Sequence, residues 1–278
     1  MKCVLSYSGG LDSTVLLWKL FKSEEYSEIH CISYDYGQRH DIEIQCAKWN
    51  VDYLNSLNTN TKIIWKQINI PFIRDIAPTS YLTSDIIEKP TGETDETPTS
   101  YVPNRNMIMI SIAASYAESV KAEHIVYGAM KDDFGGYWDC KPGFYELLNI
   151  IFIGNPDHRI EIKTPFMEYS KEDIIKEGIE LGVKFEHTWS DYSGGIMHFS
   201  TNPQFDNEMV PDFNKSTEKP LTSSMLYSRV KADAESANSR LRLISFAKLG
   251  YIDPLPYYQD LTEFWKKYNC TDIKKAKF

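Results

Sequence analysis

The feature that most constrains the fold of this chain is a glycine-rich turn close to its start. Residues 8–13 read Ser-Gly-Gly-Leu-Asp-Ser and lie between an apolar run at residues 3–5 and a helical pattern over residues 14–20. A strand, a turn of small residues and a helix in this order expose backbone N–H groups at the partly positive N-terminus of the helix. The turn therefore predicts a phosphate-binding loop. It lacks the lysine of a Walker loop and the spacing of a dinucleotide fingerprint, and an ordinary helix cap is the structural alternative.

Strand-like and helix-like segments alternate after this turn, which is the pattern of parallel strands joined by helices. We expect strands over residues 28–34, 63–68 and 124–127, and helices over about 41–57 and 106–120. Residues 71–100 are rich in Pro, Thr, Ser, Asp and Glu and are predicted to form a long loop, which in compact domains often acts as a lid. The predicted fold class is α/β, a three-layer sandwich with a mainly parallel sheet.

A smaller helical region is expected from about Ser170 onward. Ser170 is a suitable N-cap, Glu172 and Asp173 place acidic side chains in the first turn, and Gly182 is suited to end the helix. We therefore predict a nucleotide-binding α/β domain over residues 1–169 and a C-terminal helical region over residues 170–278.

Composition limits the classes of partner. A chain of 278 residues with 42% apolar residues suits one large domain, or one domain with an appendage. Its formal net charge of −9 argues against direct nucleic-acid binding and favours a small-molecule substrate. No apolar stretch approaches the ~20 residues of a membrane span, and the N-terminus does not have the layout of a signal peptide, so a cytoplasmic protein is expected. Five cysteines without CxxC spacing predict neither a disulfide framework nor a zinc cluster.

Three predicted strands are followed by unusual residues. These segments are residues 8–13, 35–40 and 128–133, and ligands of open α/β sheets bind at the carboxyl ends of the strands. We therefore expect the three segments to meet at one cleft. Tyr34 is a candidate to pack against adenine or to lie in the core, and Gly128 would let a ribose approach the backbone closely.

The phosphate-binding turn resembles the signature of the ATP pyrophosphatases, also called PP-loop enzymes, which split ATP into AMP and pyrophosphate. Five further motifs occur in order and resemble the 7-cyano-7-deazaguanine synthases of queuosine precursor synthesis. The likeness runs from residue 1 to about residue 195 and resumes over residues 239–257, where Leu-Arg and Asp-Pro-Leu-Pro-Tyr recur. The five motifs are Tyr-Asp-Tyr-Gly-Gln-Arg-His at 34–40, Tyr-Val-Pro-Asn-Arg-Asn at 101–106, residues 133–142, Thr-Pro-Phe-Met at 164–167 and Thr-Trp-Ser at 188–190.

The resemblance implies an ATP-dependent carbon–nitrogen ligase. Such an enzyme adenylates the carboxylate of 7-carboxy-7-deazaguanine, lets ammonia displace AMP to give an amide, and uses a second ATP to convert the amide to a nitrile. It implies ATP and Mg²⁺, free ammonia and a homodimer, with the aromatic tail over residues 257–265 as a contact. Two alternatives stay open. One is an enzyme that stops at the amide, as in phage-encoded relatives that serve DNA modification in a host cytoplasm. The other is a homologue that attaches a deazaguanine to a macromolecule or acts as a binding module in a multi-protein system.

The resemblance also assigns residues to the nucleotide. Asp12 is expected near the phosphates, where it helps to place magnesium, while the small residues of the turn hold pyrophosphate. The predicted ATP-binding residues are Ser8, Gly9, Gly10, Asp12, Ser13, Tyr34 and Gly128.

The catalytic candidates are Asp12, Arg105, Lys163 and His40. Arg105 and Lys163 would supply positive charge to the substrate carboxylate or to developing phosphate charge, although a pair with an acidic residue and a solvated strand-end charge are the structural alternatives. His40 would contact phosphate or activate ammonia, or cap a helix. Cys140 is expected to pack, since adenylation needs no thiol.

The substrate-binding candidates offer acceptors, cations and rings. Carboxylates would accept hydrogen bonds from the N–H groups of the base, and aromatic side chains, Trp138 included, would stack on it. The predicted set is Gln38, Arg39, Tyr101, Arg105, Asn106, Asp132, Asp133, Phe134, Tyr137 and Asp139.

The sequence departs from the family at its zinc site. Typical members carry four zinc-binding cysteines, and the matching positions here are Asp191, Asp233, Ser236 and Ser239. Because two carboxylates and two hydroxyls would hold structural zinc weakly, we predict no zinc. Residues 196–232 form an insertion that is expected to cover the active site. Hydrogen bonds from Asp191 to Ser236 or Ser239, and packing by apolar side chains of the insertion, would replace the metal; a new site formed by His187, His198 and Asp191 is the alternative.

Overall fold

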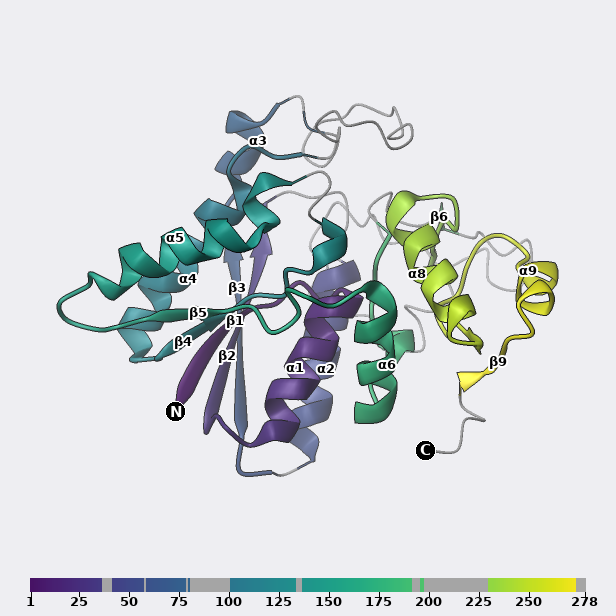
Figure 1. Ribbon diagram of the computed structural model, residues 1–278, viewed down its shortest axis with the longest axis horizontal. Helices are drawn as coiled ribbons and strands as arrows, with labels where there is room; N and C mark the ends of the chain where they lie inside the picture. The colour runs from purple at the N-terminus through teal and green to yellow at the C-terminus, as the bar shows by residue number, and fades with distance from the viewer. Residues whose placement is uncertain are drawn as a thin grey trace, which may run out of the picture.

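Five parallel strands form the central sheet of the computed structural model, in the order β3-β2-β1-β4-β5 (Figure 1). The structure describes residues 1–36, 42–57, 59–78, 80, 101–133, 137–191, 196–197 and 230–273. Every neighbouring pair in the sheet is parallel. The strands are β1 (Lys2–Ser6), β2 (Glu28–Asp35), β3 (Lys62–Asn69), β4 (His124–Val126) and β5 (Glu161–Lys163).

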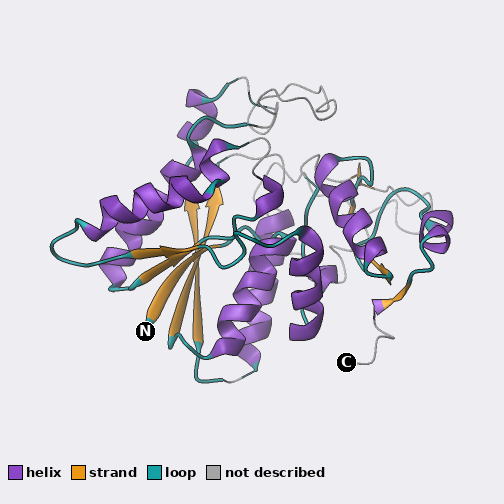
Figure 2. Cartoon of the chain, in the orientation of Figure 1, coloured by secondary structure: helices purple, strands orange, loops and turns teal. Residues whose placement is uncertain are grey.

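Helices cover both faces of this sheet, which gives the three layers predicted from the sequence (Figure 2). One face carries α4 (Arg105–Val120) and α5 (Pro142–Ile153). The other carries α1 (Leu11–Ser23), α2 (Ile42–Ser56) and α6 (Lys171–Leu181). The predicted α/β/α class is confirmed.

The central strands β1 and β2 are buried on both faces, and alternation of side chains divides the core in two. In β1, Cys3 and Leu5 belong to the cluster under α1 and α6, whereas Val4 belongs to the cluster under α4 and α5. Successive side chains of a strand point to opposite faces. A sheet covered on both sides therefore needs apolar residues at consecutive positions, and the run at the start of the chain supplies them.

The predicted elements of the first half match those of the structure within a few residues, with one correction. The segment predicted to be a loop over residues 71–100 contains a short helix, α3 (Phe72–Ile76). Its Ile73 side chain is fully buried, and this anchor favours a helical turn despite the polar composition around it. Residues 81–100 of the predicted loop lie outside the described residues.

The C-terminal region begins as the sequence predicts. Ser170 caps α6 through a capping box with Asp173, and Gly182 ends the helix at φ +80°. The buried side chains of Ile174 and Ile179 lie in the same cluster as α1, and the domain division at residue 170 stays a prediction. Further elements are α8 (Ala237–Lys248), α9 (Thr262–Lys267), the antiparallel pair β6 (Ile196–Met197) and β7 (Val230–Lys231), and the parallel pair β8 (Tyr251–Ile252) and β9 (Thr271–Asp272).

All five cysteines are free thiols, and all but Cys270 are buried. Within the described part of the chain, no helix combines the length and the apolar character needed to cross a membrane.

Candidate active site

The phosphate-binding turn lies at the carboxyl end of β1 and leads directly into α1. The Ser8 hydroxyl accepts the Gly10 N–H at 3.1 Å and lies 3.0 Å from the Ser13 hydroxyl. The Ser13 hydroxyl in turn donates to the Gly10 carbonyl oxygen at 3.2 Å. These bonds fix the turn across the start of the helix, where backbone N–H groups and the helix dipole favour an anion.

Gly9 is required at its position for two reasons. Its φ of +89° is in the region that L side chains rarely adopt, and a Cβ there would overlap the Glu43 carbonyl oxygen and lie 2.8 Å from the Ala47 nitrogen of α2. The Gly9 carbonyl oxygen also accepts the Trp189 N–H at 3.3 Å. The turn is thus packed between α2 and the segment that contains Trp189.

Glu43 is a partly buried carboxylic acid beside this turn. The Glu43 carboxyl group lies close to Gly10: if Gly10 carried a Cβ atom, that atom would be 3.5 Å from the Glu43 Oε1 atom. Burial raises the pKa of Glu43 to about 8, and the carboxylates of Asp12 and Asp191 add to this rise while the Arg105 guanidinium opposes it. The positive charge of Arg105 therefore does not offset the burial of Glu43 and the nearby carboxylates of Asp12 and Asp191.

Arg105 is a cation at the start of α4, next to a cluster of buried polar residues. It begins α4 directly after Asn104, whose φ is +54°. Its guanidinium carbon lies 5.8 Å from the centre of the Tyr36 ring, and its charge lowers the pKa values of both Glu43 and Asp139 against the effect of burial. Arg105 is therefore within electrostatic range of Glu43 and Asp139, at the end of the sheet where ligands of such folds bind.

The buried polar cluster next to Arg105 is built around Asn106. The Asn106 side-chain oxygen accepts the Tyr127 hydroxyl at 2.8 Å, and its NH₂ group reaches the Cys140 sulfur at 3.5 Å. Burial raises the pKa of the Cys140 thiol to about 12, so this thiol packs rather than reacts. Asp139, in the short helix η2 (Trp138–Cys140), is 2% exposed.

Within the described part of the chain, two buried oxygen atoms of this cluster have no hydrogen-bond partner. They are the Asp139 Oδ1 atom and the Tyr145 hydroxyl. Burial raises the pKa of Asp139, and the charge of Asp139 contributes to the raised pKa of Tyr145. Buried polar groups without partners are uncommon and costly, and both atoms belong to groups that can bind the polar edge of a heterocyclic base.

Aromatic side chains lie next to this cluster. The Trp138 indole N–H donates to the Tyr101 hydroxyl at 2.9 Å, and the rings of Tyr101 and Tyr137 are 6.2 Å apart. Trp138 is 48% exposed. The structure thus brings together the predicted residues Tyr101, Tyr137 and Asp139 with the Arg105 and Asn106 start of α4.

A second polar cluster joins the start of α1 to the start of α6. The Lys171 ammonium lies 2.7 Å from each carboxylate oxygen of Asp12, and the Lys171 backbone N–H donates to Asp132 Oδ2 at 2.9 Å. Burial raises the pKa of Asp133 to about 6, with Asp12 adding to the rise and Lys171 opposing it. Asp12, Asp132 and Asp133 therefore lie around one lysine that the sequence motifs did not indicate.

Tyr34 and Lys163 lie apart from these clusters, whereas Gly128 lies beside Ser13 of the turn. Tyr34 is 7% exposed in the core, and its hydroxyl donates to the Met109 carbonyl oxygen at 2.7 Å, which leaves little of the ring for adenine. Gly128 packs near Leu16 and Ser13 with ordinary space for a Cβ. Lys163 pairs with Glu161 at 2.6 Å on the edge strand β5. Gln38, Arg39, His40 and Phe134 lie outside the described residues, and their roles stay predictions.

Comparison with known proteins identifies the family. A family model described as "Queuosine biosynthesis protein QueC" matches residues 2–202. The chain belongs to the QueC family. A 7-cyano-7-deazaguanine synthase of Caldicellulosiruptor saccharolyticus is 40% identical over 197 residues, which cover 70% of this chain and 83% of that relative. The synthase of Oceanobacillus iheyensis is 34% identical over 258 residues, which cover 92% of this chain and 98% of the relative.

This QueC family member has hydrogen bonds at the four positions where zinc ligands are expected. The Asp191 carboxylate accepts the Asp233 backbone N–H at 2.8 Å, and the Asp233 carboxylate accepts the Gln259 NH₂ group at 2.7 Å. Ser236 and Ser239 bond to each other at 2.9 Å, so the bonds predicted from Asp191 to these serines are wrong.

These positions do not fit a structural zinc ion, because they offer carboxylates and hydroxyls without Cys or His. Among the described residues, no three His, Cys, Asp or Glu side chains form a metal-binding group. His198 and the apolar side chains of the insertion, which the sequence offered as alternatives, lie outside the described residues.

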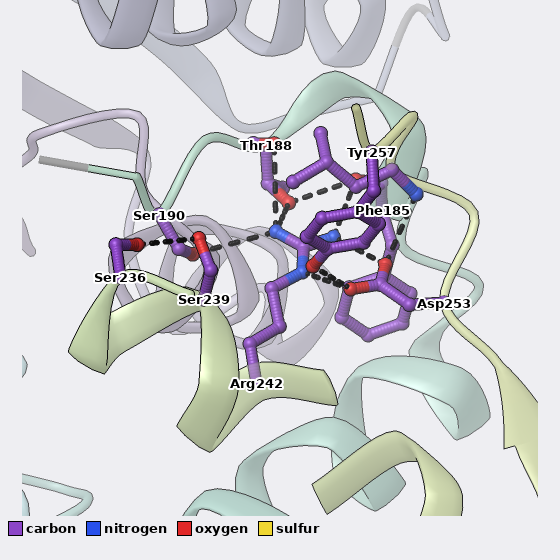
Figure 3. A network of polar contacts seen from close by, with 9 residues as sticks. Phe185, Thr188, Ser190, Ser236, Ser239, Arg242, Asp253 and Tyr257 are labelled. Atoms are coloured by element: carbon purple, nitrogen blue, oxygen red, sulfur yellow. Dashed lines mark hydrogen bonds and ion pairs between the residues drawn. The ribbon is translucent and has the colours of Figure 1, made fainter. Parts of the chain in front are cut away.

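The C-terminal QueC motifs form a buried clamp (Figure 3). Arg242 donates through Nε and Nη2 to the two carboxylate oxygens of Asp253 at 2.7 and 2.8 Å. Its Nη1 group donates to the Thr188 hydroxyl at 2.8 Å, and Nη2 donates to the Phe185 carbonyl oxygen at 3.1 Å. The Tyr257 hydroxyl completes the network by donating to Asp253 at 2.7 Å. The clamp holds residues 185–190 next to the phosphate-binding turn.

Glu43, Lys171 and Arg242 are the residues of the site whose positions the sequence did not reveal. Lys171 follows the N-cap of α6, where a lysine is unremarkable, and its partner Asp12 is 159 positions away. Arg242 belongs to the Leu-Arg motif, but the motif alone does not indicate what its side chain does. Only their tertiary neighbours show what these side chains contact.

Proposed function

We propose that this protein uses ATP and ammonia to convert the carboxylate of 7-carboxy-7-deazaguanine to an amide and then to a nitrile, 7-cyano-7-deazaguanine. The observation that carries the proposal is that Arg105 begins α4 next to Asn106 of the buried polar cluster and is within electrostatic range of Glu43 and Asp139. Arg105 acts electrostatically on Glu43, beside Gly10, and on Asp139. Membership of the QueC family, whose relatives are named 7-cyano-7-deazaguanine synthases, supports the same substrate class.

A carboxylate is a poor electrophile, so one of its oxygen atoms must first be converted to a good leaving group. A substrate carboxylate oxygen attacks the α-phosphorus of ATP, the bond to the bridging oxygen breaks, and pyrophosphate leaves. Ammonia then attacks the carboxyl carbon, the carbon–oxygen bond to AMP breaks, and a proton is lost. Adenylation of the amide oxygen by a second ATP, with loss of AMP and the remaining N–H protons, gives the nitrile.

The residues of the site suit both the leaving pyrophosphate and the reacting carboxylate of the substrate. The turn around Gly9 presents N–H groups to pyrophosphate, and Arg105 supplies fixed positive charge near the reacting carboxylate, where negative charge develops on oxygen. The Asp139 Oδ1 atom, which has no hydrogen-bond partner among the described residues, would accept an N–H of the base. A buried carboxylate oxygen without a hydrogen-bond partner favours a ligand that places a hydrogen-bond donor at that position.

The carboxylates near the turn fit a magnesium ion that is also held by phosphate. Mg²⁺ binds proteins through one or two carboxylates and takes its other ligands from phosphates and water. Asp12 and Asp133 are coupled electrostatically, and their side chains would hold the ion. When bound, magnesium would neutralise phosphate charge and polarise the phosphorus–oxygen bond.

The test is mass spectrometry of the products formed from 7-carboxy-7-deazaguanine, ATP, magnesium and ammonium. Asp12→Asn is expected to lose activity, whereas Asp157→Asn, the same change in an exposed loop, serves as the matched control. Nitrile formation by the wild type and the control supports the full proposal. Accumulation of amide without nitrile would restrict the function to amide synthesis. If neither amide nor nitrile forms and ATP is not consumed, the proposal is contradicted.

A further inference from the structure

Tyr145 carries a buried hydroxyl group next to the candidate active site. Its side chain lies in the first turn of α5 and is 3% exposed, and its hydroxyl has no hydrogen-bond partner among the described residues. A hydroxyl that loses its bonds to water on folding and does not replace them costs free energy. Such a group is explained when a ligand supplies the partner.

Neighbouring rings hold the Tyr145 side chain in place. The centre of its ring lies 5.7 Å from that of Tyr127 and 5.2 Å from that of Phe144. Phe144 in turn packs edge-on against Trp138. Because contacts on its ring restrict both side-chain torsions, the hydroxyl has a defined position. A group that recognises one atom of a ligand needs this kind of support.

The neighbouring polar groups of the cluster are paired. The Tyr127 hydroxyl donates to the Asn106 oxygen at 2.8 Å, and the Asn106 NH₂ group reaches the Cys140 sulfur at 3.5 Å. In the described part of this cluster, the Asp139 Oδ1 atom shares with the Tyr145 hydroxyl both its burial and its lack of a partner. The charge of Asp139 contributes to the raised pKa of Tyr145, so the two groups are within electrostatic range. One hydroxyl that can donate and one carboxylate oxygen that accepts are thus left together.

We infer that the Tyr145 hydroxyl donates a hydrogen bond to the ring carbonyl oxygen of the substrate, while Asp139 accepts the adjacent ring N–H. The inference rests on the proposed use of 7-carboxy-7-deazaguanine, whose six-membered ring carries a carbonyl oxygen beside an N–H group. A carboxylate oxygen only accepts, whereas a phenol hydroxyl can donate, so the pair matches this cyclic amide.

Binding of the base in this way includes a shift of η2. The chain covers both the Tyr145 hydroxyl and the Asp139 Oδ1 atom, so a ligand must open a path to them. Asp139 lies on the single turn of η2, and its neighbour Trp138 is 48% exposed. Movement of this turn exposes the two oxygen atoms without disturbing the sheet.

The first measurement separates a hydroxyl without a partner from a structural one. Tyr145→Phe is expected to raise the urea midpoint of the full chain, because it removes a buried group that makes no hydrogen bond. Tyr26→Phe is the matched control. Its ring is also 3% exposed, but its hydroxyl lies 2.8 Å from Nδ1 of His124, at the amino end of β4 and away from the site. This control is expected to lower the midpoint.

The sign of the change in stability decides this part of the test. If Tyr145→Phe is less stable than the wild type, the hydroxyl already has a partner before a ligand binds, and the inference is overturned. The second measurement is calorimetric titration with 7-carboxy-7-deazaguanine. Tyr145→Phe is expected to weaken binding about tenfold, the effect of losing one hydrogen bond, while Tyr26→Phe binds as tightly as the wild type. Unchanged affinity in Tyr145→Phe would also overturn the inference.

An analogue with sulfur in place of the ring carbonyl oxygen tests which atom the hydroxyl contacts. Sulfur accepts hydrogen bonds weakly, and the neighbouring ring N–H is retained. The wild type is expected to bind this thio analogue about tenfold more weakly than the oxygen compound, whereas Tyr145→Phe should bind the two with similar affinity. The inference fails if Tyr145→Phe keeps the wild-type ratio between the two ligands, or if the wild type does not bind the thio analogue at all.

The two proposals fail in different ways. A wild-type protein that binds neither ATP nor 7-carboxy-7-deazaguanine would contradict the proposed function. A wild type that binds both, with a Tyr145→Phe variant that binds the base equally tightly, would contradict only the role of Tyr145.

Discussion

Replacement of Glu43 by Gln is expected to change how the stability of the fold depends on pH. Burial raises the pKa of Glu43 from 4.5 to about 8. The native state therefore holds a proton that the unfolded chain releases between these two values. Since stability falls with pH wherever the native state binds more protons, the wild type should lose stability as pH rises through this interval.

The size of the effect follows from the shift. The difference between 8 and 4.5 is 3.5 pKa units, and at about 1.4 kcal/mol per unit this gives an upper bound of about 5 kcal/mol. The Glu43 side chain is partly exposed, and solvent and local relaxation reduce the cost of its charge. A loss of about 2–4 kcal/mol relative to the neutral Gln variant is the expected result.

The assay is urea unfolding of wild type and Glu43→Gln at a series of pH values between about 5 and 9, without nucleotide or divalent cation. The two proteins should approach the same stability toward the acid end, and the Gln variant should be the more stable one toward the alkaline end. Glu146→Gln, on an exposed position of α5, controls for the chemistry of the substitution. A difference between wild type and Glu43→Gln that stays constant over this range would refute the reasoning.

Three other substitutions test separate parts of the site. Gly9→Ala should destabilise the fold by more than Gly250→Ala and should also weaken ATP binding, because both glycines have positive φ but only Gly9 has backbone atoms in the space of a Cβ; Gly250→Ala should cost only about 1 kcal/mol in denaturant unfolding. Arg242→Met should lower the free energy of unfolding by about 3–5 kcal/mol, since it leaves the Asp253 carboxylate buried without its cation. Asp139→Asn should weaken calorimetric binding of 7-carboxy-7-deazaguanine by about tenfold and leave ATP binding unchanged.

Local patterns were sufficient to predict the frame of the molecule. The consecutive apolar residues of β1 and β2 indicate strands buried on both faces, and Gly9 marks the turn because few other residues fit its φ. The Ser170–Asp173 capping box is likewise a local signal. These features depend on neighbours within a few positions, so the sequence displays them directly.

The contacts that complete the site depend on residues far apart in the chain. The ion pair Lys171–Asp12 and the electrostatic effect of Arg105 on Glu43 both join different helices, and neither has a spacing that sequence periodicity can detect. Helix α3 was hidden for a related reason, since the burial of Ile73 is a tertiary contact within a polar segment. Prediction therefore identified the strand ends as the site but did not identify which charges meet there.

The clamp around Arg242 explains how this chain supports its phosphate-binding turn with no cysteine at the zinc positions. The segment over residues 185–190 contacts the turn through the Trp189 N–H and the Gly9 carbonyl oxygen. Arg242 of α8 binds this segment through Thr188 and Phe185, and Asp253 binds Arg242. Both residues are distinct from the zinc positions Asp191 and Asp233. A buried, fully hydrogen-bonded ion pair is costly to break because either partner alone is an unpaired charge. The clamp therefore fixes the segment by contacts that need no metal, and the bond between Asp191 and the Asp233 N–H closes the adjacent loop with ordinary polar atoms.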